Sequence, residues 1–220
     1  LGDVYKRQKS TLVQHLNGLI RPTAGRVLYN GEDIWKEGYP LRELRSHVGL
    51  VFQYPEHQLF EVSVIEDVKF GPKNLGLDNL EVEMRSFEAL KMVGIGDDLL
   101  DASPFALSGG QKRRVAIAGV LAMKPECIVL DEATAMLDPI GRREVLAAVE
   151  KLNREQGITV VLITHHMNEA EHADRVIVMN DGLVVMDGKP REVFTRKKEL
   201  EDIGLAVPDT VSLLFSLREA

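Results

Sequence analysis

Short apolar runs alternate with longer amphipathic stretches along this chain. Four of the runs are almost unbroken and rich in β-branched residues: 48–52, 127–130, 158–163 and 176–179. Runs of this length without polar alternation are typical of strands buried on both faces of a parallel sheet. Because helical stretches separate most of them, the pattern predicts repeated strand–helix units joined by crossovers, and hence an α/β fold.

Three further elements have clear signals for where they begin or end. Asp138 followed by Pro139 predicts a helix start, with an N-cap and a proline at the first helical position, and Gly157 is expected to end that helix. We expect Asp138 also to shape a loop that contacts a partner. The tripeptide at 180–182, Asn-Asp-Gly, predicts one antiparallel hairpin. A last amphipathic helix is expected from Pro208 onward.

Residues 54–107 contain no strong strand candidate. Apolar side chains repeat there at helical spacing, at Leu80, Met84, Phe87 and Leu90. We therefore predict a helical insert in the α/β core.

Composition narrows the function classes. The chain has 220 residues, of which 45% are apolar and 28% charged, values that exclude a disordered or fibrous protein. Its net charge of -7 argues against a broad nucleic-acid surface. The single cysteine, Cys127, forbids an internal disulfide, and no apolar run reaches the length of a membrane helix. We expect a cytosolic protein.

The strongest chemical signal is Ser108-Gly109-Gly110-Gln111, directly before the apolar stretch 115–123. Two glycines after a serine at a helix start leave backbone N–H groups accessible to a phosphate, with the helix dipole and the hydroxyl adding to the attraction. The alternative is that Ser108 only caps the helix. The motif taken alone leaves both readings open.

Polar residues follow three of the predicted strands. Asp131 and Glu132 end one strand, where Asp131 is suited to holding Mg²⁺ and Glu132 to polarising a water that attacks a phosphate. Gln53 and His165 follow two others, so that Gln53 is in reach of a metal or water. Solvated acids at a strand end are the plain alternative. A metal site made of histidines is disfavoured, because no matching ligand cluster accompanies His165, His166 and His172.

Lys9-Ser10-Thr11 resembles the end of a phosphate-binding loop of the form G-x-x-x-x-G-K-[ST]. In such a loop the lysine meets the β- and γ-phosphates and the serine holds Mg²⁺. The two glycine positions are occupied by Gln8 and Asp3, so this motif fails when taken alone.

The order of these motifs resembles the ATP-binding cassette family over essentially the whole chain. The correspondence assigns Lys9, Ser10 and Thr11 to the Walker A motif, Gln53 to the Q-loop, 107–111 to the signature, Asp131 and Glu132 to Walker B, 135–138 to the D-loop, and His165 to the switch histidine. The segments 52–60 and 163–170, Phe-Gln-Tyr-Pro-Glu-His-Gln-Leu-Phe and Ile-Thr-His-His-Met-Asn-Glu-Ala, are similar to those of energy-coupling factor importers and related cobalt/nickel importers.

The resemblance implies a RecA-like P-loop NTPase core, formed by 9–53 and 116–220, with 54–115 inserted as a helical subdomain. It implies an ATP-binding and ATP-hydrolysing subunit of a membrane importer that uses ATP and Mg²⁺. The implied catalytic residues are Glu132, His165 and Gln53. The implied metal ligands are Ser10, Gln53 and Asp131. The implied nucleotide-binding residues are Lys9, Ser10, Thr11, Ser108, Gly109, Gly110, Gln111 and Asp138.

The same resemblance implies partners and a location. They are a second cassette, identical or paralogous, an integral membrane subunit and a substrate-binding component, with this chain peripheral on the cytoplasmic face of the membrane. DNA-repair and chromosome-organising relatives carry long coiled-coil arms, whereas no heptad stretch separates Gln53 from Ser108 here. Another importer class or a translation-associated cassette protein remains an alternative.

The first eight residues depart from the family pattern. The chain starts without Met, and 3–8 reads like a translated sequencing adapter, so we expect a fragment truncated at both ends. Without the glycine loop, backbone N–H groups do not surround the β-phosphate. The 220-residue chain is therefore expected to bind MgATP poorly and to hydrolyse little.

Overall fold

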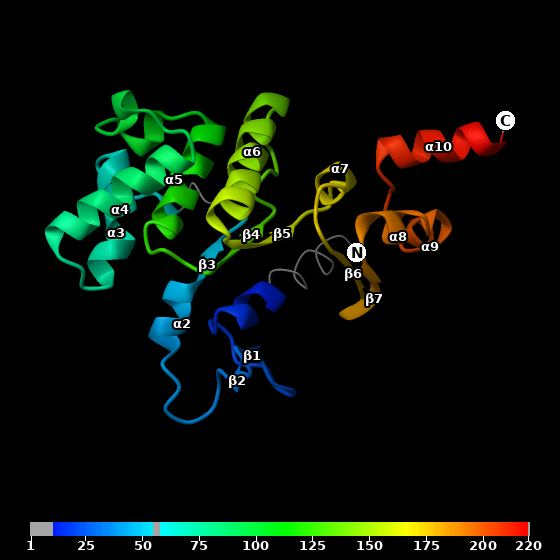
Figure 1. The fold of residues 1–220 in the computed structure, drawn as a ribbon, viewed down its shortest axis with the longest axis horizontal. Coiled ribbons are helices and arrows are strands. Elements are labelled where there is room, and N and C mark those ends of the chain that lie inside the picture. The colour runs from blue at the N-terminus through cyan, green and yellow to red at the C-terminus, as the bar shows by residue number, and fades with distance from the viewer. Residues whose placement is uncertain (1–10, 55–57, 220) are drawn as a thin grey trace. The chain divides into compact units, whose positions relative to one another are not determined.

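The computed structural model describes residues 11–54 and 58–219, which fall into two compact units. The first lies within 9–163 and the second within 164–220. Figure 1 shows both as ribbons. No helix among the described residues is long and apolar enough to cross a membrane.

A parallel sheet organises the first unit. Its strands are β3 (Val48–Val51), β4 (Cys127–Asp131) and β5 (Thr159–Ile163), in the order β3-β4-β5. Both pairings are parallel, with Leu50 opposite Val129 and Val129 opposite Val161. The predicted parallel α/β sheet is confirmed, and three of the four apolar runs form it.

Helices cover this sheet and extend beyond it. The first described helix runs through 11–16. The others are α2 (Leu41–His47), α3 (Val64–Asn74), α4 (Asn79–Met92), α5 (Gly109–Leu121) and α6 (Pro139–Gln156), with single 3₁₀ turns η2 (Asp97–Leu99) and η3 (Pro104–Ala106). A short hairpin, β1 (Leu28–Tyr29) and β2 (Glu32–Asp33), precedes α2.

Two apolar clusters fill the two faces of the sheet. The alternation of side chains along β4 sends Ile128 and Leu130 to the cluster that contains α3, α5 and α6, and Val129 to the other. Helix α5 packs so closely on the sheet that a Cβ on Gly49 would lie 2.1 Å from Val120 Cγ1. In Figure 1, α3, α4 and α5 form a helical group beside the strands.

The second unit holds a hairpin and four helices among the described residues. They are α7 (Met167–Ala170), β6 (Val176–Asn180), β7 (Leu183–Gly188), α8 (Pro190–Phe194), α9 (Lys197–Asp202) and α10 (Asp209–Glu219). β6 and β7 pair antiparallel across the turn at 181–182, which confirms the predicted hairpin. The core of this unit joins β6 and β7 to α8 and α9 through Val178, Met186, Phe194 and Leu200.

Helix predictions agree well with the structure. Asp138 and Pro139 begin α6, Gly157 ends it at φ +68°, and α10 begins directly after Pro208. The apolar repeat at Leu80, Met84, Phe87 and Leu90 lies in one helix, α4.

Burial departs from prediction at several places. The pattern predicts that the run 158–163 is buried on both faces, but every residue of β5 is at least partly exposed, and Val161 is 36% exposed. The run 176–179 is only partly buried, because it belongs to a two-stranded hairpin. Phe52 follows the end of β3 and is exposed, and the α4 residues other than Leu90 in the apolar repeat are exposed as well.

Candidate active site

The carboxyl ends of β3 and β4 carry three of the polar residues that the sequence analysis selects. Asp131 is the last residue of β4 and is 4% exposed. Glu132 follows with a half-buried side chain, and its N–H donates to the Ile163 carbonyl oxygen at 3.0 Å. Gln53 lies just beyond β3, and its Nε2 donates to Glu132 Oε2 at 2.9 Å. The fold thus joins two side chains that are 79 positions apart in the sequence.

The backbone after β4 takes an unusual path. Glu132 has φ +49° and Met136 has φ +62°, both in the left-handed region. For residues other than glycine this conformation costs roughly 1–2 kcal/mol each, so the surroundings must hold it. A reverse turn closes within the loop, where the Ala135 N–H donates to the Glu132 carbonyl oxygen at 2.9 Å.

An arginine from α5 holds this loop as well. Arg113 is 3% exposed; its Nη1 donates to the Glu132 carbonyl oxygen at 3.0 Å and its Nη2 to the Ala135 carbonyl oxygen at 2.8 Å. Burying a charge is costly unless strong hydrogen bonds compensate, and a guanidinium offers donors in a fixed fork. Arg113 therefore fixes two peptide groups of the loop at once.

Arg113 is not among the site residues predicted from sequence, although the sequence contains a signal for it. Gly110, Ile117 and Val120, at helical spacing from Arg113, are all buried in α5. An arginine on that apolar face needs buried acceptors. The run Lys112-Arg113-Arg114 hides this signal, because three basic residues in a row look like one solvated surface.

The start of α5 has the geometry of a helix cap. Ser108 Oγ accepts from the Gln111 N–H at 3.3 Å, and Gln111 Oε1 accepts from the Ser108 N–H at 2.9 Å. Ser108 therefore caps α5, and this hydrogen bonding is compatible with either interpretation of the motif. Ser108 and Gly109 remain exposed, so capping does not remove the helix start from solvent.

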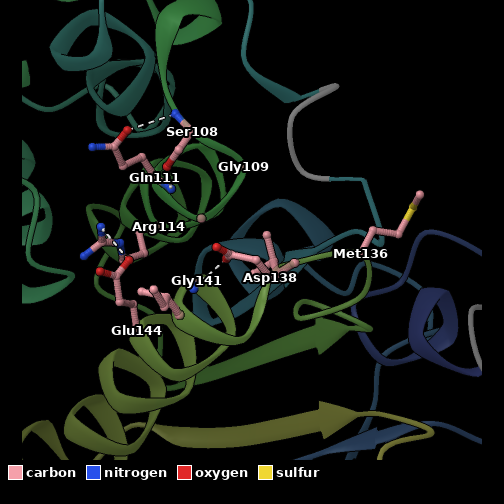
Figure 2. Close-up of a pocket in the computed structure, with 11 residues that line it drawn as sticks. Ser108, Gly109, Gln111, Arg114, Met136, Asp138, Gly141 and Glu144 are labelled. Atoms are coloured by element: carbon pink, nitrogen blue, oxygen red, sulfur yellow. Dashed lines mark hydrogen bonds and ion pairs between the residues drawn. The ribbon is translucent and has the colours of Figure 1, made fainter.

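The start of α6 meets the start of α5 at a cavity of about 370 Å³, which both helix starts line. Asp138 Oδ1 accepts from the Gly141 N–H at 2.8 Å, so Asp138 caps α6 as predicted. Figure 2 shows the Ser108 and Asp138 ends facing this cavity, with the Met136 side chain pointing away from them. The positive ends of two helix dipoles therefore lie beside one hollow.

The two helix starts are packed against each other without intervening side chains. A Cβ on Gly110 would lie 3.2 Å from the Gly141 Cα. Nearby, Arg114 Nη2 lies 3.2 Å from Glu144 Oε2 in an ion pair between the helices, visible in Figure 2. The first turns of α5 and α6 thus form one connected block.

His165 belongs to the second unit, whereas Asp131 and Glu132 belong to the first. Its ring lies 4.2 Å from that of His166, centre to centre, and is exposed. His166 is the N-cap residue of α7, and its N–H donates to Thr164 Oγ1 at 2.9 Å.

Lys9 and Ser10 lie outside the described residues, as do 1–8. Thr11 is exposed at the start of the first described helix. Among the side chains that the structure describes, no group of three His, Cys, Asp or Glu residues is placed to hold a metal ion. That arrangement still fits Mg²⁺, which is usually held by one or two carboxylates together with substrate phosphates.

A second cavity, of about 540 Å³, lies between α2, α3 and α5. The rings of Phe60 and Phe70 meet edge-to-face on its wall, 4.9 Å apart, and both are exposed. Asp67 Oδ1 holds this loop by accepting from the N–H groups of Phe60 and Glu61 at 3.0 and 3.2 Å. Burial raises the pKa of Asp67, while the two hydrogen bonds oppose the rise.

The chain is similar in sequence to a known protein family and to individual proteins. Residues 9–135 match the family model described as ABC transporter. The chain is 57% identical over 212 residues to the energy-coupling factor transporter ATP-binding protein EcfA2 of Symbiobacterium thermophilum, covering 96% of this chain and 73% of that protein.

Solved structures agree in fold. The cbiO1 protein of Clostridium perfringens, described as part of the ABC transporter complex cbiONQ, is 41% identical with a TM-score of 0.79, covering 94% of this chain and 82% of that one. The ATP-binding cassette MJ0796, solved as a dimer in a post-hydrolysis state bound to ADP and Pi, is 32% identical with a TM-score of 0.72, covering 83% and 81%. The described sheet and helices are those of a RecA-like P-loop fold.

Proposed function

Because this chain belongs to the ABC transporter family, we propose that it is the ATP-binding and ATP-hydrolysing subunit of a membrane importer of the energy-coupling factor type. The observation that carries the proposal is the meeting of Gln53 and Glu132 beside the buried Asp131 at one edge of the sheet. Ligands of open α/β sheets bind at this edge. The identity to an EcfA2 protein supports the importer type.

The residues at the sheet edge fit a nucleotide with Mg²⁺. We assign Asp131 and Gln53, together with Ser10, to the metal, and Lys9, Ser10 and Thr11 to the phosphates. Asp131 suits this role because a buried carboxylate at a strand end gains most from a cation partner. When bound, Mg²⁺ neutralises charge on the phosphate oxygens.

Glu132 is assigned the role of general base. Its carboxylate is oriented from two sides, by the Gln53 amide on Oε2 and by the fixed peptide that follows its Cα. A carboxylate has about four acceptor positions, so a water fits beside the amide of Gln53. Glu132 then takes a proton from that water as the water oxygen attacks the γ-phosphorus, the bond from phosphorus to the β,γ-bridging oxygen breaks, and ADP leaves with that oxygen. We assign His165 to the same phosphate.

The cavity between the starts of α5 and α6 is proposed to face the nucleotide of a second cassette. Ser108, Gly109, Gly110 and Gln111 offer the hydroxyl, backbone and amide donors, and Asp138 shapes the neighbouring loop. Two helix N-termini at one hollow favour an anion. The dimer recorded for MJ0796 supports this arrangement, in which two cassettes enclose ATP between them.

The second cavity, between α2, α3 and α5, is proposed to bind the membrane subunit. Its apolar walls and the exposed Phe60 and Phe70 suit an apolar segment of a partner protein. Both aromatic rings belong to the segment 54–115, which we propose as the helical subdomain inserted between 9–53 and 116–220, while α2 and the later part of α5 complete the cavity wall. It would hold the chain peripherally on the cytoplasmic face of the membrane, and a separate component would bind the imported substrate.

The test uses the full-length protein purified together with its membrane subunit. MgATP hydrolysis by the complex is expected, with retained nucleotide binding and lost turnover in Glu132→Gln. Absence of hydrolysis in the intact complex would refute the proposal. Salt-dependent binding to duplex DNA, without co-purification of a membrane protein, would favour the DNA-repair class instead.

A further inference from the structure

The base proposed above is attached to α5 by a buried arginine. Arg113 binds the carbonyl oxygens of Glu132 and Ala135, which lie on the two sides of a tight turn. Its side chain is 3% exposed, so water has little access to these contacts. Two bonds from one planar group restrain rotation as well as translation of the turn.

This restraint acts on the direction of the Glu132 side chain. The peptide that follows Glu132 is fixed by Arg113, and the peptide that precedes it is fixed by the N–H bond to the Ile163 carbonyl. With both neighbouring peptides held, φ of Glu132 stays at +49° and the Cα–Cβ bond has one direction. The carboxylate of Glu132 then accepts the hydrogen bond from Gln53 Nε2.

The same arginine connects Glu132 to the Ser108 end of α5. Arg113 lies five residues beyond Ser108, or roughly 7 Å along the helix axis. The close packing of Gly110 on Gly141 and the ion pair of Arg114 with Glu144 join this turn of α5 to α6. If the start of α5 moves, Arg113 moves with it, and its two hydrogen bonds carry the loop after β4 along.

We propose that Arg113 is a positioning residue for Glu132, which couples the state of the Ser108 end of α5 to the orientation of the base. The inference rests on the proposed function, because it presumes that Glu132 acts on water and that Ser108 meets a nucleotide. Arg113 touches neither water nor nucleotide in this role. A ligand at the start of α5 in one cassette thereby biases hydrolysis at the sheet edge of that same cassette.

The test measures steady-state hydrolysis by the full-length complex with Arg113→Met and Arg113→Lys. The methionine keeps the volume and removes both donors, and we expect kcat to fall about 10–100-fold while KM for ATP stays within about threefold. Lysine restores one donor, so its kcat should lie between those of the wild type and Arg113→Met. Lys151→Met serves as the control, because Lys151 is exposed on α6 and forms only a 3.9 Å ion pair with Glu155.

A double variant separates positioning from general stability. In the Glu132→Gln background, Arg113→Met should change the residual single-turnover rate by less than about twofold, because the group that it positions is already gone. An undiminished loss in that background overturns the inference, as does wild-type kcat in Arg113→Met. If Arg113→Met does not fold, wild-type kcat in Arg113→Lys overturns it. A wild-type complex without hydrolysis refutes the proposed function instead.

Discussion

Two loops follow the carboxyl ends of β3 and β4. Each is held by one buried ionisable side chain from a neighbouring helix. Asp67 of α3 accepts two N–H groups from the loop after β3, and Arg113 of α5 donates to two carbonyl groups of the loop after β4. The former loop carries the exposed Phe60, whereas the latter carries Glu132.

Arg113 and Asp67, the two residues that anchor these loops, differ in whether their charge depends on pH. Arginine stays protonated at any physiological pH, and each Nη of Arg113 has a carbonyl partner. Asp67 uses only Oδ1, and within the described part of the chain Oδ2 has no hydrogen-bond partner. Its burial raises its pKa. The loop proposed to position the general base is thus held by a permanent charge, while the loop proposed to meet a membrane partner is held by a weaker, titratable contact.

The largest expected effect tests whether the loop after β4 carries the reaction. Glu132→Gln keeps the size of the side chain but cannot take a proton, so turnover should fall about 10²–10⁴-fold with ATP binding retained. Glu126→Gln is a matched control, since Glu126 directly precedes the other end of β4. Equal turnover in the Glu132 and Glu126 variants, measured by phosphate release, would contradict the assignment.

The next largest effect concerns the two histidines that follow β5. His165→Ala should lower turnover by about 10²-fold as a γ-phosphate contact is lost, whereas His166→Ala should stay near the wild type. The difference is expected because His166 lies at the N-cap position of α7 without a side-chain capping bond, and its bond to Thr164 Oγ1 comes from the backbone N–H, which alanine keeps. An inactive His166→Ala with an active His165→Ala would reverse the two roles.

Stability provides the direct comparison of the two anchors. Arg113→Met leaves two buried carbonyl groups without these donors and should lower the free energy of unfolding by about 2–4 kcal/mol. Asp67→Asn keeps an oxygen for both N–H groups and should change it by less than about 1 kcal/mol. Urea unfolding of both variants measures the difference, and equal losses would remove the distinction between the loops.

The sequence predicted the elements better than it predicted their surroundings. Strand positions and the α6 caps follow from local patterns, because apolar runs, Asp138-Pro139 and Gly157 act within a few residues. The exposure of Val161 was not predictable in this way, since it depends on which elements pack against β5: β3 also lies at an edge of the described sheet and is buried throughout.

The residues of the candidate site also fall into those that a local pattern predicts and those that depend on distant contacts. Asp131 and Glu132 are recognisable because a strand ends at them, and Ser108 because glycines follow it. Arg113 and Asp67 act through backbone groups of distant segments, and a backbone carbonyl or N–H has no sequence signature. Only the fold reveals which loop a buried charge will meet.

The smallest expected effect concerns the pH dependence of the two carboxylates that are adjacent on α3. The folded-state pKa of Asp67 is raised by burial, so the native state binds this proton more tightly than the unfolded chain does. Its contribution to stability is therefore greatest at low pH and is lost as the pH rises through the folded pKa. Lowering the pH from 7 to about 4, into the ordinary range of an aspartic acid, should increase the Tm of the wild type relative to Asp67→Asn by about 1–3 °C.

Glu66 provides a control of opposite sign. Hydrogen bonds from Lys73 and Lys69 lower its pKa, so its contribution is present at neutral pH and is lost as the pH falls through the folded value. Relative to Glu66→Gln, the wild type should lose stability on acidification, and only weakly because this carboxylate is about one-third exposed. Thermal unfolding of both variants at pH 7 and at about pH 4, where the Glu66 contribution begins to be lost, checks the two signs. If the Asp67 and Glu66 differences shift in the same direction, the hydrogen bonds from Phe60 and Glu61 outweigh burial at Asp67, and the proposed contrast between a titratable and a permanent charge is lost.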